Sequence, residues 1–517
     1  MQGSTLAWLY FFDMERLITC MFLLYTHIAL SQTYFSNIYG LPYPYVETFW
    51  GGISVPDSGY LCSMTGFNYL LDTNAMYLSK FDREGSLVWG KSYGEAGTSH
   101  ETYQIKPFGV NYLIVGGERK NDTASAIIFK VSPEGDSLWL KTYNDTSRTC
   151  FFDNIHTTSD GGLIAVGASE KWDTLAQESL YKQIYVVKTD SLGNQEWSLT
   201  HGLYEFNDQI NDIIELPDYS FLAVGFKAYI YISDFFVNSM IYHISATGVI
   251  LSEQEFHTDL VNHALSVIQP TADGNYLVCG MYANDDWLHP DPHGTGGILI
   301  KLNPEGDTLW WKWYGDDIYD LLIYDMVQLA DGSIVCVGYR IYDQSEPILA
   351  KFSPDGEVLW YRVYNYNIDK GECLFDIEAC YDGGFILSGY ATPLGVVGNN
   401  ASDAWLIKVD SMGCPEPNCV ITDDTHTPIQ IARIEAVPNP ASQQVSLQGT
   451  VSSHVWELAV RMYSASGQLM YQTKVPTPSD TLHLDIDIST WPAGVYSYHT
   501  ISSDGTWGSS GRVVVVR

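Results

Sequence analysis

The apolar positions of this 517-residue chain follow one pattern that recurs seven times. Each copy has a turn that usually contains Gly, then a short apolar run, then a Gly that ends the run. The closing glycines lie 50, 51, 58, 55, 58 and 51 residues apart, at Gly66, Gly116, Gly167, Gly225, Gly280, Gly338 and Gly389. A period of roughly 55 residues predicts one supersecondary unit per copy, each packed on its neighbours.

A second apolar run follows each of these strands and ends in Lys, before a Gly-containing turn and usually Trp. In one copy Trp310, Lys312 and Tyr314 alternate, which is the period of a β-strand and places all three on one face. Asp-Gly and Pro-Glu-Gly segments supply tight turns, because Gly tolerates positive φ and Pro presets φ. No helical period occurs. We therefore expect an all-β fold, in which each copy is a four-stranded antiparallel sheet and the array is a seven-bladed β-propeller.

The seventh copy lacks its fourth strand, because Gly413 runs directly into Cys414-Pro415. The segment Val46–Gly51, which precedes the first copy, matches the missing strand in length and ends in Trp-Gly. We predict that this segment completes the last sheet and closes the ring.

Length variation is concentrated in one class of loop. With strands named A to D from the centre outward, the A–B and C–D turns lie on one face, and the B–C and D–A loops lie on the other. We expect long B–C loops at 168–183, 226–238, 281–296 and 390–402, where recognition can reside. The candidate binding residues are Trp172, Asp285, Asp286, Trp287, His289, Asp291 and His293. They could bind a metal or a sugar, but their spacing fits no metal motif, which favours an exposed polar insertion.

The recurrent Trp residues could be mistaken for carbohydrate platforms. Their fixed position in the repeat instead predicts packing within and between sheets.

The repeat ends before the last 85 or so residues, which carry a different set of motifs. These are Val437-Pro438-Asn439-Pro440-Ala441, Tyr463-Ser464-Ala465-Ser466-Gly467-Gln468, Trp491-Pro492-Ala493-Gly494-Val495-Tyr496 and Gly511-Arg512-Val513-Val514-Val515-Val516. In this order they resemble the type A C-terminal sorting domain of the type IX secretion system of Bacteroidetes. The resemblance implies a small Ig-like β-sandwich, recognition by the secretion machinery, and release or attachment to surface lipopolysaccharide. The repeats more loosely resemble propeller repeats of such secreted proteins, which implies a fold rather than an activity.

The N-terminus has the features of a signal peptide. Residues 17–30 form an apolar run, and Ala29-Leu30-Ser31 places small residues at the −3 and −1 positions, so we predict cleavage between Ser31 and Gln32. The expected organisation is a signal peptide at 1–31, the propeller at 32–413, a linker at 414–432 and the sorting domain at 433–517.

The net charge argues against one class of partner, and the cysteines have structural roles. The chain has 61 acidic and 26 basic residues, a net charge of −35 that would repel a phosphate backbone, so we expect no nucleic-acid partner. Cys62, Cys279 and Cys336 fall in apolar runs and are expected to fill the core. Cys414 and Cys419 could form a local disulfide in an oxidising compartment.

No catalytic, metal or cofactor motif occurs: there is no Gly-rich phosphate loop, nucleophile elbow or His-Glu-x-x-His segment. The favoured hypothesis is a non-catalytic surface or secreted protein that binds a protein or glycan through the long-loop face. The alternative is a carbohydrate-active hydrolase or lyase on a propeller scaffold. A sialidase-type site would need converging Arg residues, and Arg119 and Arg340 follow the Gly-ending strands of two different copies.

Overall fold

The computed structural model is composed of β-strands, with no helix among the residues that it describes. It describes residues 32–517 except for 41–44, 69–72, 95–96, 121–122, 145–147, 174–177, 203–205, 232–233, 257–261, 283–295, 315–319, 342–344, 365–370, 393–401, 416–429, 432–433, 451–456, 465–468, 477–480 and 503–506. Accordingly, that part of the chain contains no helix long and apolar enough to cross a membrane.

Seven of the described sheets have four antiparallel strands, and we number them sheets 1 to 7 along the chain. Sheet 1 contains β2 (Tyr45–Ser54), β3 (Tyr60–Asn68), β4 (Thr73–Phe81) and β5 (Leu87–Tyr93). Sheet 2 contains β6 (Thr98–Phe108), β7 (Asn111–Lys120), β8 (Thr123–Val131) and β9 (Ser137–Tyr143). Sheet 3 contains β10 (Arg148–Thr157), β11 (Leu163–Asp173), β12 (Glu178–Thr189) and β13 (Gln195–His201). Sheet 4 contains β14 (Phe206–Glu215), β15 (Phe221–Tyr231), β16 (Asp234–Ile244) and β17 (Ile250–Glu255).

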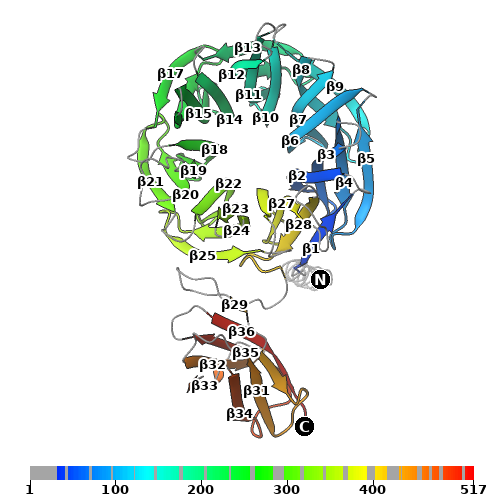
Figure 1. Ribbon diagram of the computed structural model, residues 1–517, viewed down its shortest axis with the longest axis vertical. Coiled ribbons are helices and arrows are strands. Elements are labelled where there is room, and N and C mark those ends of the chain that lie inside the picture. The colour runs from blue at the N-terminus through cyan, green and yellow to red at the C-terminus, as the bar shows by residue number, and fades with distance from the viewer. Residues whose placement is uncertain are drawn as a thin grey trace, which may run out of the picture.

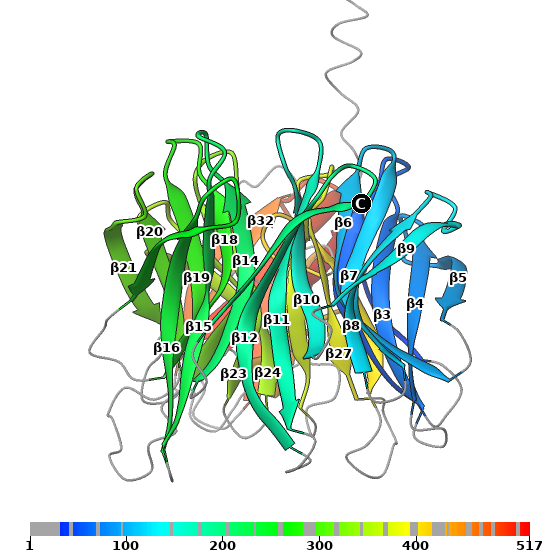
Figure 2. The ribbon, with the colours of Figure 1, turned by 90° about the horizontal axis from the view of Figure 1, so that it is seen from above.

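The remaining three sheets of this kind complete the array. Sheet 5 contains β18 (His263–Pro270), β19 (Tyr276–Tyr282), β20 (Gly296–Leu302) and β21 (Thr308–Tyr314). Sheet 6 contains β22 (Asp320–Gln328), β23 (Ile334–Ile341), β24 (Ser345–Phe352) and β25 (Val358–Val363). Sheet 7 contains β26 (Cys373–Ala379), β27 (Phe385–Ala391), β28 (Asp403–Val409) and β1 (Phe35–Tyr39). Figure 1 shows these sheets side by side around a common centre, and Figure 2 shows the same array edge-on.

The hydrophobic core lies mainly between neighbouring sheets. One cluster joins Leu222 and Val224 of sheet 4 to Val278 and Ile300 of sheet 5, all almost fully buried. Each innermost strand also has a β-bulge in its pairing with the second strand, for example between Phe152 and Asn154. A bulge adds one residue and re-aims the side chains around it, so every sheet turns its inner strand toward the centre in the same way.

The last sheet is closed from the N-terminal side, as predicted, but the assigned segment was wrong. The strand that pairs with β28 is β1, with Phe35 opposite Lys408 and Tyr39 opposite Ala404. The predicted segment, Val46–Gly51, instead lies in β2, the innermost strand of sheet 1. The reason is that Phe35-x-Asn37-x-Tyr39-Gly40 provides the same alternation, with Phe for Trp and Asn for Lys.

Where the outermost strand carries the aromatic alternation, it packs onto the turn that follows the third strand of the next sheet. The Tyr hydroxyls donate to turn carbonyls in four described cases: Tyr93 to Gly135 (2.6 Å), Tyr143 to Gly193 (2.7 Å), Tyr314 to Gly356 (2.6 Å) and Tyr364 to Gly413 (2.7 Å). Gly135 has φ 76°, and a Cβ there would lie 2.5 Å from the Trp89 ring. Tyr39 of β1 donates in the same way to the Gly85 carbonyl, so the seam between sheets 7 and 1 repeats the contact. The predicted packing role of these Trp residues is confirmed at the described seams.

The recurrent Lys at the end of the third strand pairs with the Asp of the A–B turn in the same sheet. The described pairs are Lys80–Asp57 (2.6 Å), Lys188–Asp160 (2.8 Å), Lys301–Asp273 (2.5 Å) and Lys408–Asp382 (2.9 Å). The repeated Lys and Asp-Gly phrases are therefore two halves of one structural contact.

Two of the four predicted long loops are largely strand. In sheet 3, β11 and β12 extend through most of 168–183, and in sheet 4, β15 and β16 leave only residues 232–233 between them. In sheet 4 this stretch is rich in the aromatic and β-branched residues that favour strands, so the hairpin lengthens instead of becoming irregular. Most of the other two loops lies outside the described residues.

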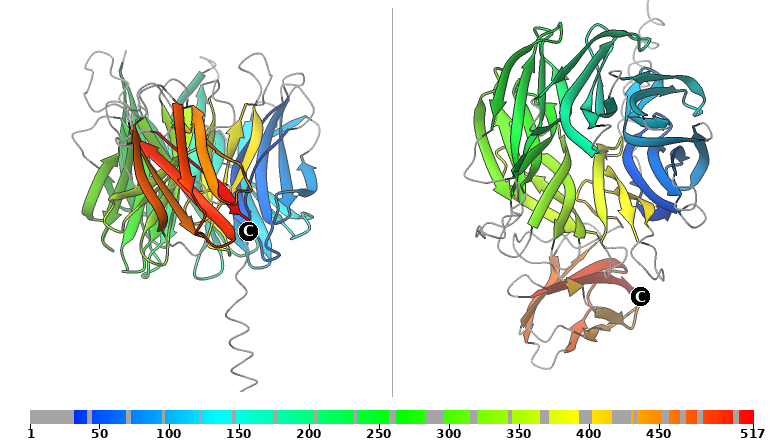
Figure 3. Two further views of the ribbon diagram at one scale, coloured as in Figure 1. Left: turned by 90° about the horizontal axis from the view of Figure 1, so that it is seen from below. Right: turned by 45° about the horizontal axis from the view of Figure 1, so that its top comes forward.

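The C-terminal part forms two further sheets that share a core. One contains β29 (Gln430–Ile431), β36 (Trp507–Val515), β35 (Gly494–Ser502), β32 (Glu457–Ser464) and β33 (Leu469–Pro476). The other contains β30 (Ile434–Val437), β31 (Gln444–Thr450) and β34 (Thr481–Asp487). Both contribute to one buried cluster that includes Val445, Val460 and Val513. Figure 3 shows these strands, in orange and red, as a unit apart from the ring.

The cysteines lie as the sequence suggests. Cys62, Cys279 and Cys336 are buried free thiols, which confirms their assignment to the core. Burial raises the pKa of each well above its usual range, so they stay protonated. Cys414 is disulfide-bonded, and its predicted partner Cys419 lies outside the described residues.

Candidate functional site

The candidate binding residues of the long loops are for the most part not described. Trp172 lies on β11 opposite Ser179, and its side chain is outside the described part. Asp285, Asp286, Trp287, His289, Asp291 and His293 all fall within 283–295, also outside it. These positions stay predictions. No group of three or more His, Cys, Asp or Glu side chains that could hold a metal occurs within the described ranges.

Three carboxylates on innermost strands, the buried Asp212 and Asp376 and the half-buried Asp325, are structural. Asp376 accepts hydrogen bonds from the Gly52 amide (2.9 Å) and the Gln104 side chain (3.0 Å), both in other sheets. Asp325 accepts from the amides of Met326 (2.8 Å) and Ile377 (3.1 Å). Asp212 accepts from the Ile213 and Ile268 amides (both 2.9 Å), the Asn154 side chain (2.8 Å) and His156 (2.6 Å). Each carboxylate thus ties its own inner strand to a neighbouring one.

Lys106 faces these carboxylates. Burial alone would lower its pKa, but the charges of Asp376 and Asp325 outweigh burial and raise the pKa above the usual value. Burial and then the charge of Asp376 raise the pKa of Asp325 well above its usual range. Main-chain amides occupy oxygens of all three carboxylates. This cluster therefore offers little to a ligand.

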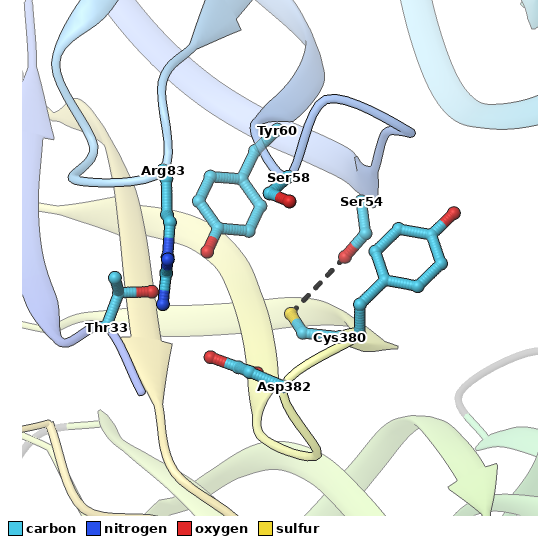
Figure 4. Close-up of a pocket in the computed structure, with 8 residues that line it drawn as sticks. Thr33, Ser54, Ser58, Tyr60, Arg83, Cys380 and Asp382 are labelled. Carbon is cyan, nitrogen blue, oxygen red and sulfur yellow. Dashed lines mark hydrogen bonds between the residues drawn. The ribbon is translucent and has the colours of Figure 1, made fainter. Parts of the chain in front are cut away.

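A small pocket lies on the short-turn face, at the seam between sheets 7 and 1 (Figure 4). Ser54 donates to the Cys380 sulfur at 3.3 Å, and Arg83, Tyr60 and Thr33 lie around Asp382. Its volume is only about 20 Å³, which is close to the space of a single water molecule. We therefore assign this pocket to ring closure.

A larger hollow, of about 210 Å³, opens between sheets 2 and 3. Its lining comes from the start of the first strand, the end of the second and the start of the third in these two sheets, so it lies on the B–C loop face. The lining residues are Ser99, Glu101, Tyr103, Gly117, Arg119, Ala124, Thr149, Cys150, Phe151, Glu170 and Lys182. Two of them, Glu170 and Lys182, fall within the segment 168–183 that the sequence singled out.

Aromatic rings form one wall of this hollow. Tyr103 and Phe151, from adjacent sheets, are half-buried, with ring centroids 5.9 Å apart and tilted by 54°. The Tyr103 hydroxyl donates to Glu101 at 2.8 Å. Burial, and then the charge of Glu101, raises the pKa of Tyr103, so this hydroxyl stays protonated. On its other side Tyr103 contacts Trp50 of sheet 1, with ring centroids 5.7 Å apart.

Charged groups of both signs complete the lining. Lys182 pairs with Glu170 at 3.2 Å, and its ammonium lies 5.2 Å from the Phe151 ring centroid. Arg119 is exposed on β7. Beside the hollow, burial raises the pKa of Asp153 to about 7, against the opposing charge of Lys182. Arg340, the other Arg that follows a Gly-ending strand, pairs with Glu346 at 2.6 Å within sheet 6 and does not line this hollow.

The sorting motifs converge on the last strand and the C-terminus. The Asn439 side chain accepts the Val514 amide at 2.8 Å, which places the Pro438-Asn439-Pro440 segment against β36. The Tyr496 hydroxyl donates to the Pro492 carbonyl at 2.8 Å and so closes the Pro492-Ala493-Gly494 turn. Arg517 donates to the carbonyls of Ile488 (2.8 Å) and Trp491. The predicted turn residue Gly467 lies outside the described part.

Sequence reasoning missed the hollow, because its lining is spread over 84 positions, from Ser99 to Lys182, in two repeats. Each residue alone looks like an ordinary strand or turn residue. A usable signal was Phe151, which is aromatic where the matching positions of the neighbouring sheets, Glu101 and Gln209, are polar.

Comparison with known proteins identifies a family for the C-terminal part of the chain. Residues 435–515 match the family described as the secretion system C-terminal sorting domain. The chain therefore carries a type IX sorting domain, which indicates export and a cell-surface or extracellular location. No curated protein matches the chain.

Several solved structures are similar to this chain at low identity. The chain is similar to a Pyrococcus horikoshii acylaminoacyl peptidase (11% identity, TM-score 0.39, 79% of this chain and 58% of that one). It is similar to the β-propeller domain of a trilobed protease from Pyrococcus furiosus (9%, 0.37, 70% and 95%). It is also similar to PorZ, a surface component of the type IX secretion system of Porphyromonas gingivalis (7%, 0.19, 93% and 100%). The chain spans 58% of the peptidase's length, and none of these likenesses bears on activity.

Proposed function

We propose that this protein is a non-catalytic, exported binding protein whose sheets 1 to 7 form the blades of a seven-bladed β-propeller. In this proposal the signal peptide at 1–31 is removed after Ser31, the propeller occupies 32–413, and an Ig-like sandwich at 433–517 follows the linker 414–432. The type IX machinery of a bacterium of the Bacteroidetes recognises the sandwich. The mature protein is then released or attached to surface lipopolysaccharide.

The ligand, a protein or a glycan, binds on the B–C loop face. The observation that carries this assignment is the hollow between sheets 2 and 3, which opens on that face and combines aromatic, acidic and basic groups. The opposite face is built from short hydrogen-bonded turns, and its pocket holds about 20 Å³. A small number of placed polar groups beside an apolar wall is the usual composition of a ligand site.

The experiment blocks one face at a time in the chain from Gln32 to Arg517. Lys120→Cys places a thiol at the exposed end of β7 on the loop face, and Glu305→Cys places one on an exposed turn of the opposite face. Each variant is labelled with a bulky maleimide and tested on a glycan array and on surface-protein extracts. Labelled, unsubstituted protein is the control for other thiols.

We expect the label at position 120 to abolish capture and the label at position 305 to leave it unchanged. Equal effects of the two labels, or no capture by the unlabelled protein, would overturn the proposal.

A further inference from the structure

The hollow between sheets 2 and 3 has a composition that selects one chemical class of ligand. We propose that it binds a single uncharged sugar unit, with the sugar's C–H face on Phe151 and Tyr103 and its hydroxyls on the charged rim. This inference rests on the proposed function, since it names the ligand of the same face.

The size of the hollow limits the ligand to one small unit. Its volume of about 210 Å³ lies below the ~300–1,000 Å³ typical of pockets for drug-sized molecules. Phe151 and Tyr103 are half-buried, so their rings present a partly exposed surface without leaving the fold. An aromatic face is electron-rich and attracts the weakly positive C–H groups of a ring that lies flat on it.

The charges of the rim argue against an ionic ligand. Glu101 and Glu170 are matched by Arg119 and Lys182, so the lining has no net charge. An anionic sugar would approach two carboxylates in a protein of net charge −35, and a cationic one would approach two cations. A polyhydroxylated neutral ring meets neither penalty, because each hydroxyl can donate to a carboxylate and accept from a cation.

The rim is also held in place before any ligand arrives. Glu101 accepts from both the Tyr103 hydroxyl (2.8 Å) and the Asn74 side chain (2.7 Å), which fixes its orientation. Lys182 is held between Glu170 and the Phe151 ring. Groups held in this way lose little conformational entropy on binding. Arg119, exposed at the edge, can swing onto a ligand hydroxyl.

The test uses calorimetric titration of the chain from Gln32 to Arg517. The probes are neutral oligosaccharides of hexose and N-acetylhexosamine units, and uronic-acid oligosaccharides of the same length. We expect at least one neutral probe to bind, with an affinity that changes little between 50 mM and 500 mM NaCl, and the acidic probes to bind more weakly. Phe151→Ala should weaken binding about three- to tenfold, as loss of one aromatic contact implies.

Two further variants separate a lost site from a damaged fold. Arg119→Gln changes an exposed side chain and should weaken binding about threefold, as expected for one hydrogen bond, with no change in melting temperature. Tyr381→Ala removes an aromatic residue that is 65% exposed on the opposite face, and should leave binding unchanged.

Stronger binding of the acidic probes, no binding of any neutral probe, or neutral binding insensitive to both Phe151→Ala and Arg119→Gln would overturn the sugar assignment. None of these results would touch the loop-face proposal, which the labelled-cysteine variants test separately.

Discussion

Asp208 provides the most quantitative test of how this ring is held together. It lies on β14 opposite Lys227, its side chain is fully buried, and neither carboxylate oxygen has a hydrogen-bond partner among the described residues. Burial raises the pKa of Asp208 to about 7, although the charge of Lys227 opposes the shift. The perturbation is Asp208→Asn, which keeps the shape of the side chain and removes its charge.

The sign follows from linkage between protonation and folding. The folded-state pKa lies above the unfolded value of 3.8, so the folded form binds the proton more tightly. Below pH 3.8 Asp208 is protonated in both the folded and the unfolded state, so its ionisation does not reduce the free energy of unfolding. As the pH rises toward 7 the folded state loses stability. Each pH unit in that window is worth about 1.4 kcal/mol, so the total is at most about 4 kcal/mol. Between pH 5 and pH 8 the gain from Asp208→Asn over the wild type should grow by about 2–3 kcal/mol.

The assay is urea denaturation of wild type and variant at pH 5, 6, 7 and 8. Other groups that titrate in this range, such as Asp153 and Glu378, contribute equally to both proteins and cancel in the difference. Asp355→Asn, on an exposed turn, is the matched control and should give a difference independent of pH. If the difference between Asp208→Asn and wild type stays constant from pH 5 to pH 8, the carboxylate is not buried unpaired and the reasoning is refuted.

Three further predictions concern the seams and the strand contacts. Tyr143→Phe removes the buried hydrogen bond to the Gly193 carbonyl and should lower the free energy of unfolding by about 1–3 kcal/mol in urea denaturation; a loss below about 0.5 kcal/mol would contradict the contact. Phe35→Ala should cost about 3–5 kcal/mol and make the N-terminal strand sensitive to limited proteolysis, whereas an unchanged cleavage pattern would argue against β1 as the closing strand. Lys408→Met leaves Asp382 without its partner at 2.9 Å and should cost about 3–5 kcal/mol at pH 7; addition of Asp382→Asn should recover part of the loss, and no recovery would exclude the pair as its cause.

Much of the fold could be predicted because the same pattern of strands and turns occurs seven times in the sequence. The alternation of Trp310, Lys312 and Tyr314 gave the face of the outer strand, and the turn glycines gave the strand boundaries. The Trp in Val46–Gly51 made this segment the better match to the repeat, and it was wrongly predicted as the closing strand. The contact itself needs only an aromatic ring and a Tyr hydroxyl over the next turn, which Phe35 and Tyr39 provide.

The candidate site could be predicted only as a face. The antiparallel order of strands fixes which connections share a face, and that inference requires no knowledge of side-chain positions. The hollow itself depends on how two sheets meet, so Arg119 of sheet 2 and Lys182 of sheet 3 come together although 63 positions separate them. No single position in the sequence indicates that these two side chains line the same hollow. The residues that composition drew attention to, in 283–295, lie outside the described part.

The chain has 61 acidic residues, so acidity alone could not identify a site; the hydrogen-bond partners of each carboxylate can. Asp376 and Asp325 each accept a main-chain amide from a neighbouring sheet, and their lone pairs are committed to holding inner strands together. Glu101 accepts only from side chains in the hydrogen bonds described, and it lies exposed at the edge of a hollow. A ligand hydroxyl can compete for Glu101 without loosening a strand, whereas competition for Asp376 would open the seam beside Gly52. Selection for binding can therefore act on the rim of the hollow while the centre of the ring stays constrained by folding.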